Sequence, residues 1–204
     1  VQRGTYTDLE ACRRFYAGNT NYPQPEKTVS AAEAVLVALS LYDGEFRELA
    51  EAAAARPTCR FPVNYENELP VAILLPHLSF VKKVAVVNEL RAIARLDLGQ
   101  SPQALADVTL GFRLANGLRQ EPILISHLVR IAIMGMNLQI IREGLVRHAW
   151  SDAQLAEMDR LLASVDLLAD YKQSMRGERA CTLGTLDYLR RRTSLAAMGS
   201  ALVG

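Results

Sequence analysis

A run of nineteen residues, ILISHLVRIAIMGMNLQII at positions 123–141, constrains the fold of this chain more than any other feature. It is almost entirely apolar, and a helix of this length reaches across the hydrocarbon core of a membrane. However, His127, Arg130 and Asn137 lie within it, and each adds an insertion penalty of up to a few kcal/mol. The flanking segments have the capping signals of ordinary helices. The run therefore predicts the central helix of a helical core, and no membrane span within this chain.

The polar residues of this run share one narrow face when they are placed at 100° per residue. Arg130 and Asn137 fall within about 40° of each other, and His127 lies about 60° beyond Arg130. The apolar residues point elsewhere, so we expect the helix to be buried over most of its circumference. The residues expected to be most buried are Leu128, Ile131 and Leu138.

Helix start signals recur along the whole chain. Capping boxes, in which a side chain at the cap and one three residues later satisfy free N–H groups, occur at Thr7–Glu10, Ser30–Glu33 and Ser151–Gln154. Two more helices are expected to start at Ser101-Pro102 and at Pro122. We find no alternation of apolar and polar residues with hairpin turn signals, which makes strands improbable.

These signals predict an all-α fold of about eight helices with no sheet. Short connections make consecutive helices antiparallel, so the expected architecture is a stack of helical hairpins, similar to an α-solenoid. We expect one domain over 1–204, with N-terminal helices in 1–55 and the main stack in 71–204. The connection 56–70 contains three prolines and has no clear period, so it is expected to be irregular.

Composition excludes several classes of protein. Lys plus Arg is 23 and Asp plus Glu is 22, a formal net charge of +1, which argues against a nucleic-acid partner. The cysteines, Cys12, Cys59 and Cys181, form no metal-binding spacing, and the sequence leaves open whether two of them pair. The common nucleotide-binding, zinc-protease and hydrolase motifs are missing, so we expect no metal, no cofactor and no catalytic residues.

Five residues are candidates for a ligand- or partner-binding site. His127 and Arg130, one turn apart, have the chemistry to bind an anion, although they also suit a solvent-facing or loop-bonding role. Because a buried arginine without a carboxylate costs several kcal/mol, we expect His127, Arg130 and Asn137 to line a groove that reaches solvent. Glu178 is a distant carboxylate within possible reach of Arg130. Arg60, in the irregular connection, is a candidate for holding another carboxylate.

One hairpin, residues 88–118, resembles a tetratricopeptide-type repeat. Ala92, Gly99, Ala104 and Gly111 are small residues at positions where that repeat needs close helix contact. The aromatic residue expected on the first helix is missing, and the terminal proline comes late, at Pro122. The resemblance implies helical stacking over about thirty residues.

A broader resemblance covers about residues 50–190. The segments CRFP at 59–62, LLPHL at 74–78, an alanine-rich hairpin at 91–115 and PILISHLVRIAI at 122–133 are similar to those of uncharacterised bacterial all-helical proteins. This resemblance implies a helical fold and brings no activity with it. Because the chain starts VQRGTYTD without an initiator Met, we expect it to be a piece of a longer protein, either cytoplasmic or an extracytoplasmic domain of an anchored or exported one.

These observations favour a non-catalytic binding or scaffolding module, because stacked hairpins present grooves in which a peptide or partner helix lies. The alternative is a small-ligand-binding protein or enzyme with a pocket near His127, Arg130 and the 56–70 connection. A third is a structural domain of a membrane-anchored protein. A closed pocket with converging charged groups would favour the ligand hypothesis, and an open apolar face would favour the partner hypothesis.

Overall fold

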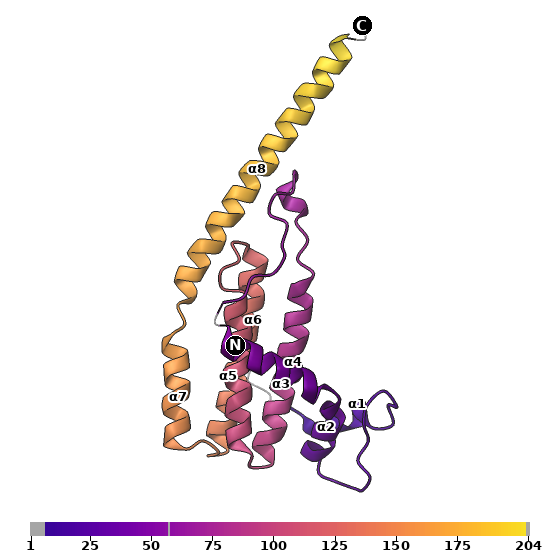
Figure 1. The fold of residues 1–204 in the computed structure, drawn as a ribbon, viewed down its shortest axis with the longest axis vertical. Helices are drawn as coiled ribbons and strands as arrows, with labels where there is room; N and C mark the ends of the chain where they lie inside the picture. Colours follow the sequence, from indigo (N-terminus) through magenta and orange to yellow (C-terminus); the bar gives the residue numbers. More distant parts are fainter. Residues whose placement is uncertain (1–6, 57, 203–204) are drawn as a thin grey trace.

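The computed structural model describes residues 7–56 and 58–202, with side chains described through Thr193, and every regular element in that part of the chain is a helix (Figure 1). The all-α prediction without a sheet is therefore confirmed for the described residues. The α-helices are α1 (Leu9–Tyr16), α2 (Ala31–Leu39), α3 (Asp43–Ala55), α4 (His77–Asp97), α5 (Ser101–Gly117), α6 (Leu124–Val146), α7 (Asp152–Ala163) and α8 (Leu167–Leu202). Two short 3₁₀ helices, η1 (Ser40–Tyr42) and η2 (Pro70–Ala72), complete the set.

The number of substantial helices is smaller than the sequence predicts. Six helices of twelve or more residues occur among the described residues, where about eight were expected, and α1 and α2 are short. The two shorter helices, α1 and α2, both lie in the N-terminal segment, where α2 ends at Leu39 and η1 follows it directly. A 3₁₀ turn here tightens the end of α2 before α3 begins.

Capping explains most of the helix boundaries. The boxes at Ser30 and Ser151 form as predicted, with Glu33 and Gln154 as the reciprocal side chains. At α1 the prediction is wrong by one residue, because Asp8, rather than Thr7, caps the helix through the backbone N–H of Ala11. The backbone N–H of Thr7 instead donates to Glu143 of α6, at 3.0 Å, which ties the N-terminal segment to the core.

The core lies between α4, α5 and α6, which stand side by side in Figure 1. Alanines at their contacts, such as Ala92 and Ala104, are fully buried and allow the helices to approach closely. Phe112 and Ile133 fill the remaining space between them. Gly111 is required at the contact of α5 with α6, because a Cβ there would lie 2.0 Å from Oδ1 of Asn137.

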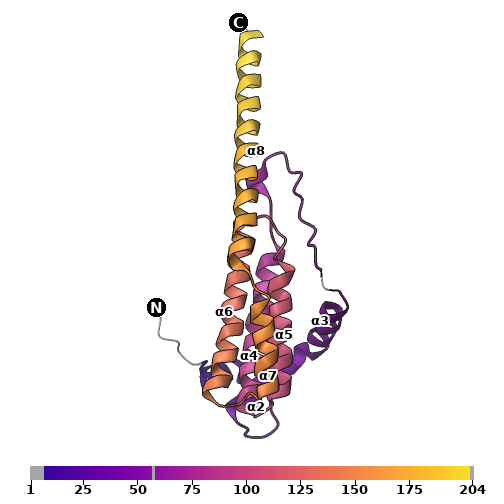
Figure 2. The ribbon, with the colours of Figure 1, turned by 90° about the vertical axis from the view of Figure 1, so that its left-hand side faces the viewer.

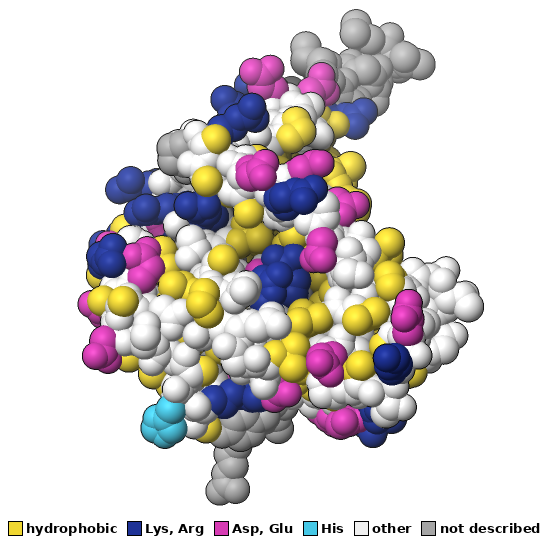
Figure 3. All heavy atoms as spheres, turned by 60° about the horizontal axis from the view of Figure 1, so that its bottom comes forward, with side chains coloured by type: hydrophobic (Ala, Val, Ile, Leu, Met, Phe, Trp, Pro, Cys, Tyr) yellow, Lys and Arg dark blue, Asp and Glu magenta, His cyan; other side chains and the backbone are white. Residues whose placement is uncertain are grey.

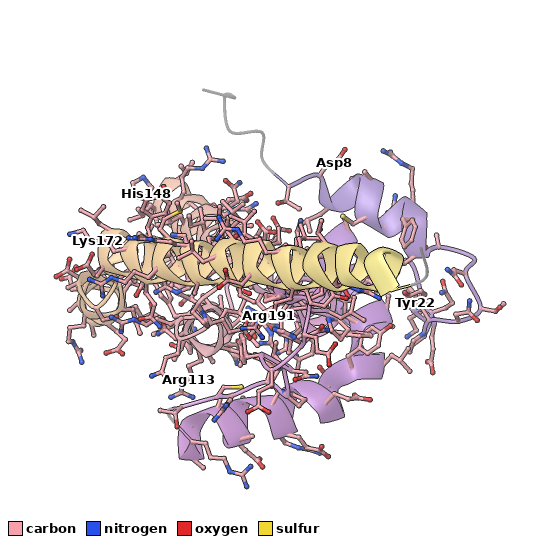
Figure 4. All side chains as sticks on the ribbon, turned by 90° about the horizontal axis from the view of Figure 1, so that it is seen from above. Asp8, Tyr22, Arg113, His148, Lys172 and Arg191 are labelled. Carbon is pink, nitrogen blue, oxygen red and sulfur yellow. The ribbon has the colours of Figure 1, made fainter. Side chains whose placement is uncertain are left out.

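The long helix α8 is held over its first half and projects beyond the other helices (Figures 1 and 2). Seen from above, it crosses over them, with Lys172 near its start (Figure 4). Gly177 packs so closely on the α5–α6 connection that a Cβ would lie 1.6 Å from the carbonyl oxygen of Pro122. Further along, Gly184 contacts Pro70 of η2, which joins the irregular connection to α8.

Two helical stretches, Pro70–Asp97 and Leu124–Val146, are long and apolar enough to cross a membrane when judged by length and composition alone. Buried helices of soluble proteins meet the same criteria. The second stretch is the run at 123–141, and its burial within the bundle is uneven around its circumference, as described below.

Candidate binding surfaces

The polar face of α6 is its most deeply buried face. Arg130 and Asn137 are each 1% exposed, and His127 is 5% exposed. The expectation that these three residues line a solvent-reaching groove is therefore wrong. They are brought together, as predicted, but they point into the bundle toward α5 and α8.

Arg130 is buried because a carboxylate from another helix meets it. Its Nη1 lies 2.6 Å from Oδ2 of Asp170, at the start of α8, and its Nη2 donates to Oδ1 of Asn116 on α5 at 3.3 Å. Asp170 also accepts from Nε of Arg119 at 2.9 Å. One aspartate of α8 therefore joins this helix to α6 and to the α5–α6 connection. Glu178 was the carboxylate suggested from sequence, but Asp170 is the partner.

The electrostatics of this ion pair are dominated by desolvation. Burial lowers the pKa of the Arg130 guanidinium, and the Asp170 carboxylate opposes that effect. Burial also lowers the pKa of His127, and the nearby Arg130 lowers it further. His127 lies beside Tyr171 of α8, with ring centroids 6.0 Å apart. A neutral imidazole between an arginine and a tyrosine suits packing better than anion binding.

The opposite face of α6 is apolar and exposed. Leu128, Ile131 and Leu138, which were expected to be the most buried residues, are 50%, 40% and 51% exposed. That prediction is wrong, because a helical projection shows which residues share a face and not which face meets the core. The ion pair with Asp170, forty residues away in sequence, decides the orientation.

Seven positions form a stripe that we call the α6 outer stripe: Leu124, Leu128, Ile131, Gly135, Leu138, Arg142 and Leu145, of which the first and the sixth are half-buried and the other five are exposed. Their spacing alternates between four and three residues, which is the heptad spacing of a helix-pairing seam. Ile125 and Val146 extend the same apolar face at its two ends. Figure 2 shows α6 at the margin of the bundle.

Glu178 has a structural contact in the fold. Its Oε1 accepts from the backbone N–H of Leu124 at 2.8 Å, so it satisfies one of the free donors at the start of α6. A carboxylate at this end also complements the helix dipole. Glu178 therefore attaches α8 to the N-terminus of α6.

Arg60 lies in a small pocket on the irregular connection. The pocket has a volume of about 310 Å³ and is bounded by this connection and the α5–α6 turn, including Cys59, Tyr65 and Glu121. Burial raises the pKa of the Cys59 thiol, and Glu121 raises it further. The alternative hypothesis placed His127 and Arg130 in the same pocket as this connection, but neither of them lines it.

Behind this pocket, the irregular connection is anchored by an aromatic contact. Phe61 stacks on the imidazole of His77 with ring centroids 4.3 Å apart. The Nε2 atom of His77 lies 2.7 Å from Oε1 of Glu121, and both side chains are largely buried. This arrangement joins the irregular connection to the start of α4 and to the α5–α6 connection.

A larger hollow lies between α3 and α4, which we call the α3–α4 groove. Its volume is about 830 Å³, and its walls are mainly apolar. Phe46 forms part of its floor and is held by the guanidinium of Arg91, 4.0 Å from the ring centroid. Arg91 is in turn fixed by Asp107 at 2.7 Å. The residues that line the groove are Tyr42, Glu45, Phe46, Leu49, Ser79, Lys82, Lys83, Val84, Val86 and Val87.

The groove is not apparent from the sequence, because the groove depends on how α3 lies against α4. A signal was present in the spacing: the lining residues recur every three or four positions on both helices. No group of three or more metal-ligating side chains occurs within the part of the chain that the structure describes. The three cysteines, Cys12, Cys59 and Cys181, are free thiols.

The surface outside these regions carries mixed charge. On the face shown in Figure 3, acidic and basic side chains alternate with hydrophobic ones, and neither sign dominates. This pattern agrees with the net charge of +1.

Comparison with known proteins places the chain beside no known family. A scan against family models gave no match, and searches of the curated proteins and of the solved structures gave none either. The function of this chain is therefore inferred from its pockets and its exposed apolar surfaces.

Proposed function

We propose that this protein is a non-catalytic binding module that holds an amphipathic helix of a partner protein in the α3–α4 groove. The observation that carries the proposal is the groove itself, an open apolar hollow of about 830 Å³ between two helices. Exposed apolar surface of this kind, rimmed by charge, is typical of sites where proteins associate.

The spacing of the lining residues supports a helical occupant. On the α3 side the groove is lined at position 42, in η1, and at 45, 46 and 49, and on α4 at 79, 82, 83, 86 and 87, with Val84 as an additional lining residue. Both sets follow the i, i+3, i+4, i+7 pattern of a helix face that packs on another helix. The two faces lie side by side with a gap between them, so a third helix would complete the layer.

The charge at the rim indicates the chemistry of that helix. Lys82 and Lys83 are exposed on the α4 side, and Glu45 is exposed on the α3 side. A helix with an apolar stripe and acidic residues on the edge beside α4 would place opposite charges together. Such pairs at an interface rim increase the association rate and select the orientation.

The α4–α5 hairpin supplies the rigid support for this groove. It is the hairpin that resembles a tetratricopeptide-type repeat. In our proposal it acts as such repeats do, because the stacked pair of helices holds one wall of the groove, on α4, in place for a partner. The buried network of Arg91, Arg95 and Asp107 fixes α4 against α5. Asn88 donates to the backbone carbonyl of Asp107 at 2.8 Å and adds to this network.

The experiment is a titration of the full chain with fluorescently labelled amphipathic peptides, followed by anisotropy. One peptide carries acidic residues beside its apolar stripe, and the other has the same stripe with lysines in their place. We expect the acidic peptide to bind at least about ten-fold more tightly, with most of the difference lost at high salt.

A matched pair of variants locates the binding. Val86→Glu places a charge in the groove and should abolish binding of the acidic peptide. Phe15→Glu changes an exposed apolar residue of α1 and should leave binding unchanged, since Phe15 lies outside the groove. Equal affinity for both peptides, or binding that survives Val86→Glu, would contradict the proposal.

A further inference from the structure

The α6 outer stripe is a second exposed apolar surface, separate from the α3–α4 groove. It lies on a different helix, and its exposed residues are large and aliphatic. Of the residues of α6 that are not buried, only Arg142 is charged, since Arg130 and Glu143 face inward. Exposing an apolar face of three heptads with so little charge to water is unfavourable, and such a face is typical of a surface that associates with a partner.

We infer that the α6 outer stripe is the interface of a symmetric dimer, in which α6 of one copy packs antiparallel against α6 of a second copy of this chain. The heptad spacing favours a helix as the occupant, because side chains at intervals of three and four residues along a narrow seam interlock with those of another helix. The stripe is also longer than a small ligand would cover. The stripe is also self-complementary, being apolar on both sides of its midpoint.

The area is sufficient for a specific contact. Leu128, Leu138 and Leu145 are each about half exposed, and Ile125, Ile131 and Val146 have similar exposures. Together these side chains leave on the order of 500 Å² per copy, or about 1,000 Å² for a pair, which is the area a specific interface requires.

The single charge selects the antiparallel arrangement. In a parallel pair, the two Arg142 guanidinium groups would face each other at the same level of the seam. In an antiparallel pair centred on Gly135, Arg142 lies opposite Leu128, and the two arginines are about 21 Å apart along the axis. The antiparallel pair also places opposite ends of the two helix dipoles together.

Gly135 suits the crossing point of the two helices. A Cβ at this position would meet nothing within 4 Å in the single chain, so no intramolecular contact explains a glycine there. At the centre of an antiparallel pair, the missing side chain allows the two backbones to approach closely. Its partners at one turn on either side, Ile131 and Leu138, then pack against Leu138 and Ile131 of the second copy.

Sedimentation of the full chain across micromolar to millimolar concentrations tests the dimer. The parent chain should sediment as a dimer at the upper end, and Leu138→Lys should raise the dissociation constant about 100-fold or more, because the charge enters the interface twice. The matched control is Leu183→Lys on α8, since Leu183 is 52% exposed and Leu138 is 51% exposed. The control should dimerise as the parent does, and so should the groove variant Val86→Glu.

Cysteine cross-linking in a Cys59→Ser background tests the arrangement. Gly135→Cys should give a covalent dimer on oxidation, because the two positions coincide at the crossing. Ile131→Cys should not, because the two copies of that position are about 12 Å apart along the axis. Cross-linking of both variants would indicate a parallel pair and overturn the proposal.

Two further results would also overturn it. One is a chain that stays monomeric at every concentration. The other is a monomer that binds vesicles of a neutral phospholipid and loses this binding in Leu138→Lys, which would assign the stripe to a lipid surface. Circular dichroism of each variant at low concentration establishes that the fold is unchanged, which is expected because the substituted residues are exposed.

Discussion

The two faces of α6 differ in a way that hydrophobicity alone does not predict, because the buried face holds polar side chains beside apolar ones. The inner face carries His127, Arg130 and Asn137 and is closed off by α5 and α8. The outer face carries leucines and isoleucines and is open. Burial on the inner face is possible because each charge meets a specific partner, with Asp170 the most important.

This comparison shows that the orientation of an apolar helix is decided by its costliest groups. An arginine that is buried without a partner loses several kcal/mol, whereas a half-exposed leucine loses about half of its possible burial energy. Once Asp170 is available, burying the ion pair together with the small residues around it allows close packing of α5 and α6. The leucines of the opposite face then remain exposed on the surface of the single chain.

The largest expected effect is the loss of Asp170. In Asp170→Ala, the Arg130 guanidinium stays buried without its carboxylate, so the free energy of unfolding should fall by about 3–5 kcal/mol. Urea denaturation followed by circular dichroism measures this change. The double variant Arg130→Met with Asp170→Leu should recover most of the loss, since neither charge remains. An Asp170→Ala variant that unfolds at the parent's midpoint would show that the inner face is not held by this pair.

The next effect depends on pH and concerns a second carboxylate on the inner side. Burial, together with the smaller effect of the neighbouring Glu143 of α6, raises the pKa of Glu89, on α4, to about 7. Because the folded pKa lies above the unfolded value, this group's stabilisation is complete below the unfolded pKa of 4.5 and is lost as the pH rises through about 7.

We therefore expect Glu89→Gln to be more stable than the parent well above pH 7, by about 2 kcal/mol after solvent screening of this partly exposed side chain is allowed for, and equally stable below pH 4.5. Thermal or urea unfolding of both proteins across this pH range measures the difference. The comparison with the parent removes the contribution of all other titrating groups. A difference that does not vary with pH would indicate that Glu89 is solvated.

A smaller effect distinguishes two glycines that touch the two faces. Gly111→Ala on α5 forces a Cβ against Asn137 of the inner face, so the free energy of unfolding should fall by about 1–2 kcal/mol. Gly135→Ala on the outer face meets open space in the single chain, and it should gain up to about 1 kcal/mol from helix propensity. Both values are measured at a concentration where the chain is monomeric. Equal changes in the two variants would contradict the assignment of the faces.

The smallest effect is expected at Leu128. Leu128→Ala should change the stability of the monomer by less than about 0.5 kcal/mol, because the side chain is half exposed. Ile133→Ala, on the inner side of the same helix and fully buried, should cost about 2–4 kcal/mol and serves as the reference. A loss at Leu128 as large as that at Ile133 would restore the orientation that the sequence suggested.

The helices were largely predictable, because their signals are local. Ser30 and Ser151 cap helices through residues only three positions away, as predicted. The irregular connection was also predictable, since proline removes backbone donors. Even the shift of the first cap from Thr7 to Asp8 is a choice between two adjacent residues with suitable side chains.

The binding surfaces were less predictable, because they depend on contacts between distant segments. The grouping of His127, Arg130 and Asn137 on one face follows from helix geometry, but the direction of that face depends on Asp170. Glu178 was a plausible partner for Arg130 from its chemistry and caps α6 instead. The α3–α4 groove depends on the relative placement of two helices, which no local pattern specifies.

Because the second half of α8 projects beyond the other helices, a small rotation of this helix moves its far end over a larger distance than the residues near the pivot. Gly184, midway along α8, packs on Pro70 of η2, and from there the helix continues to Leu202. At 1.5 Å per residue this leaves an arm of about 27 Å, so a tilt of about 10° at Gly184 moves the tip by about 5 Å. The Asp170 end lies about 21 Å from Gly184 on the other side, so a rotation about Gly184 moves the far end of α8 about 1.3 times as far as it moves the Asp170 end.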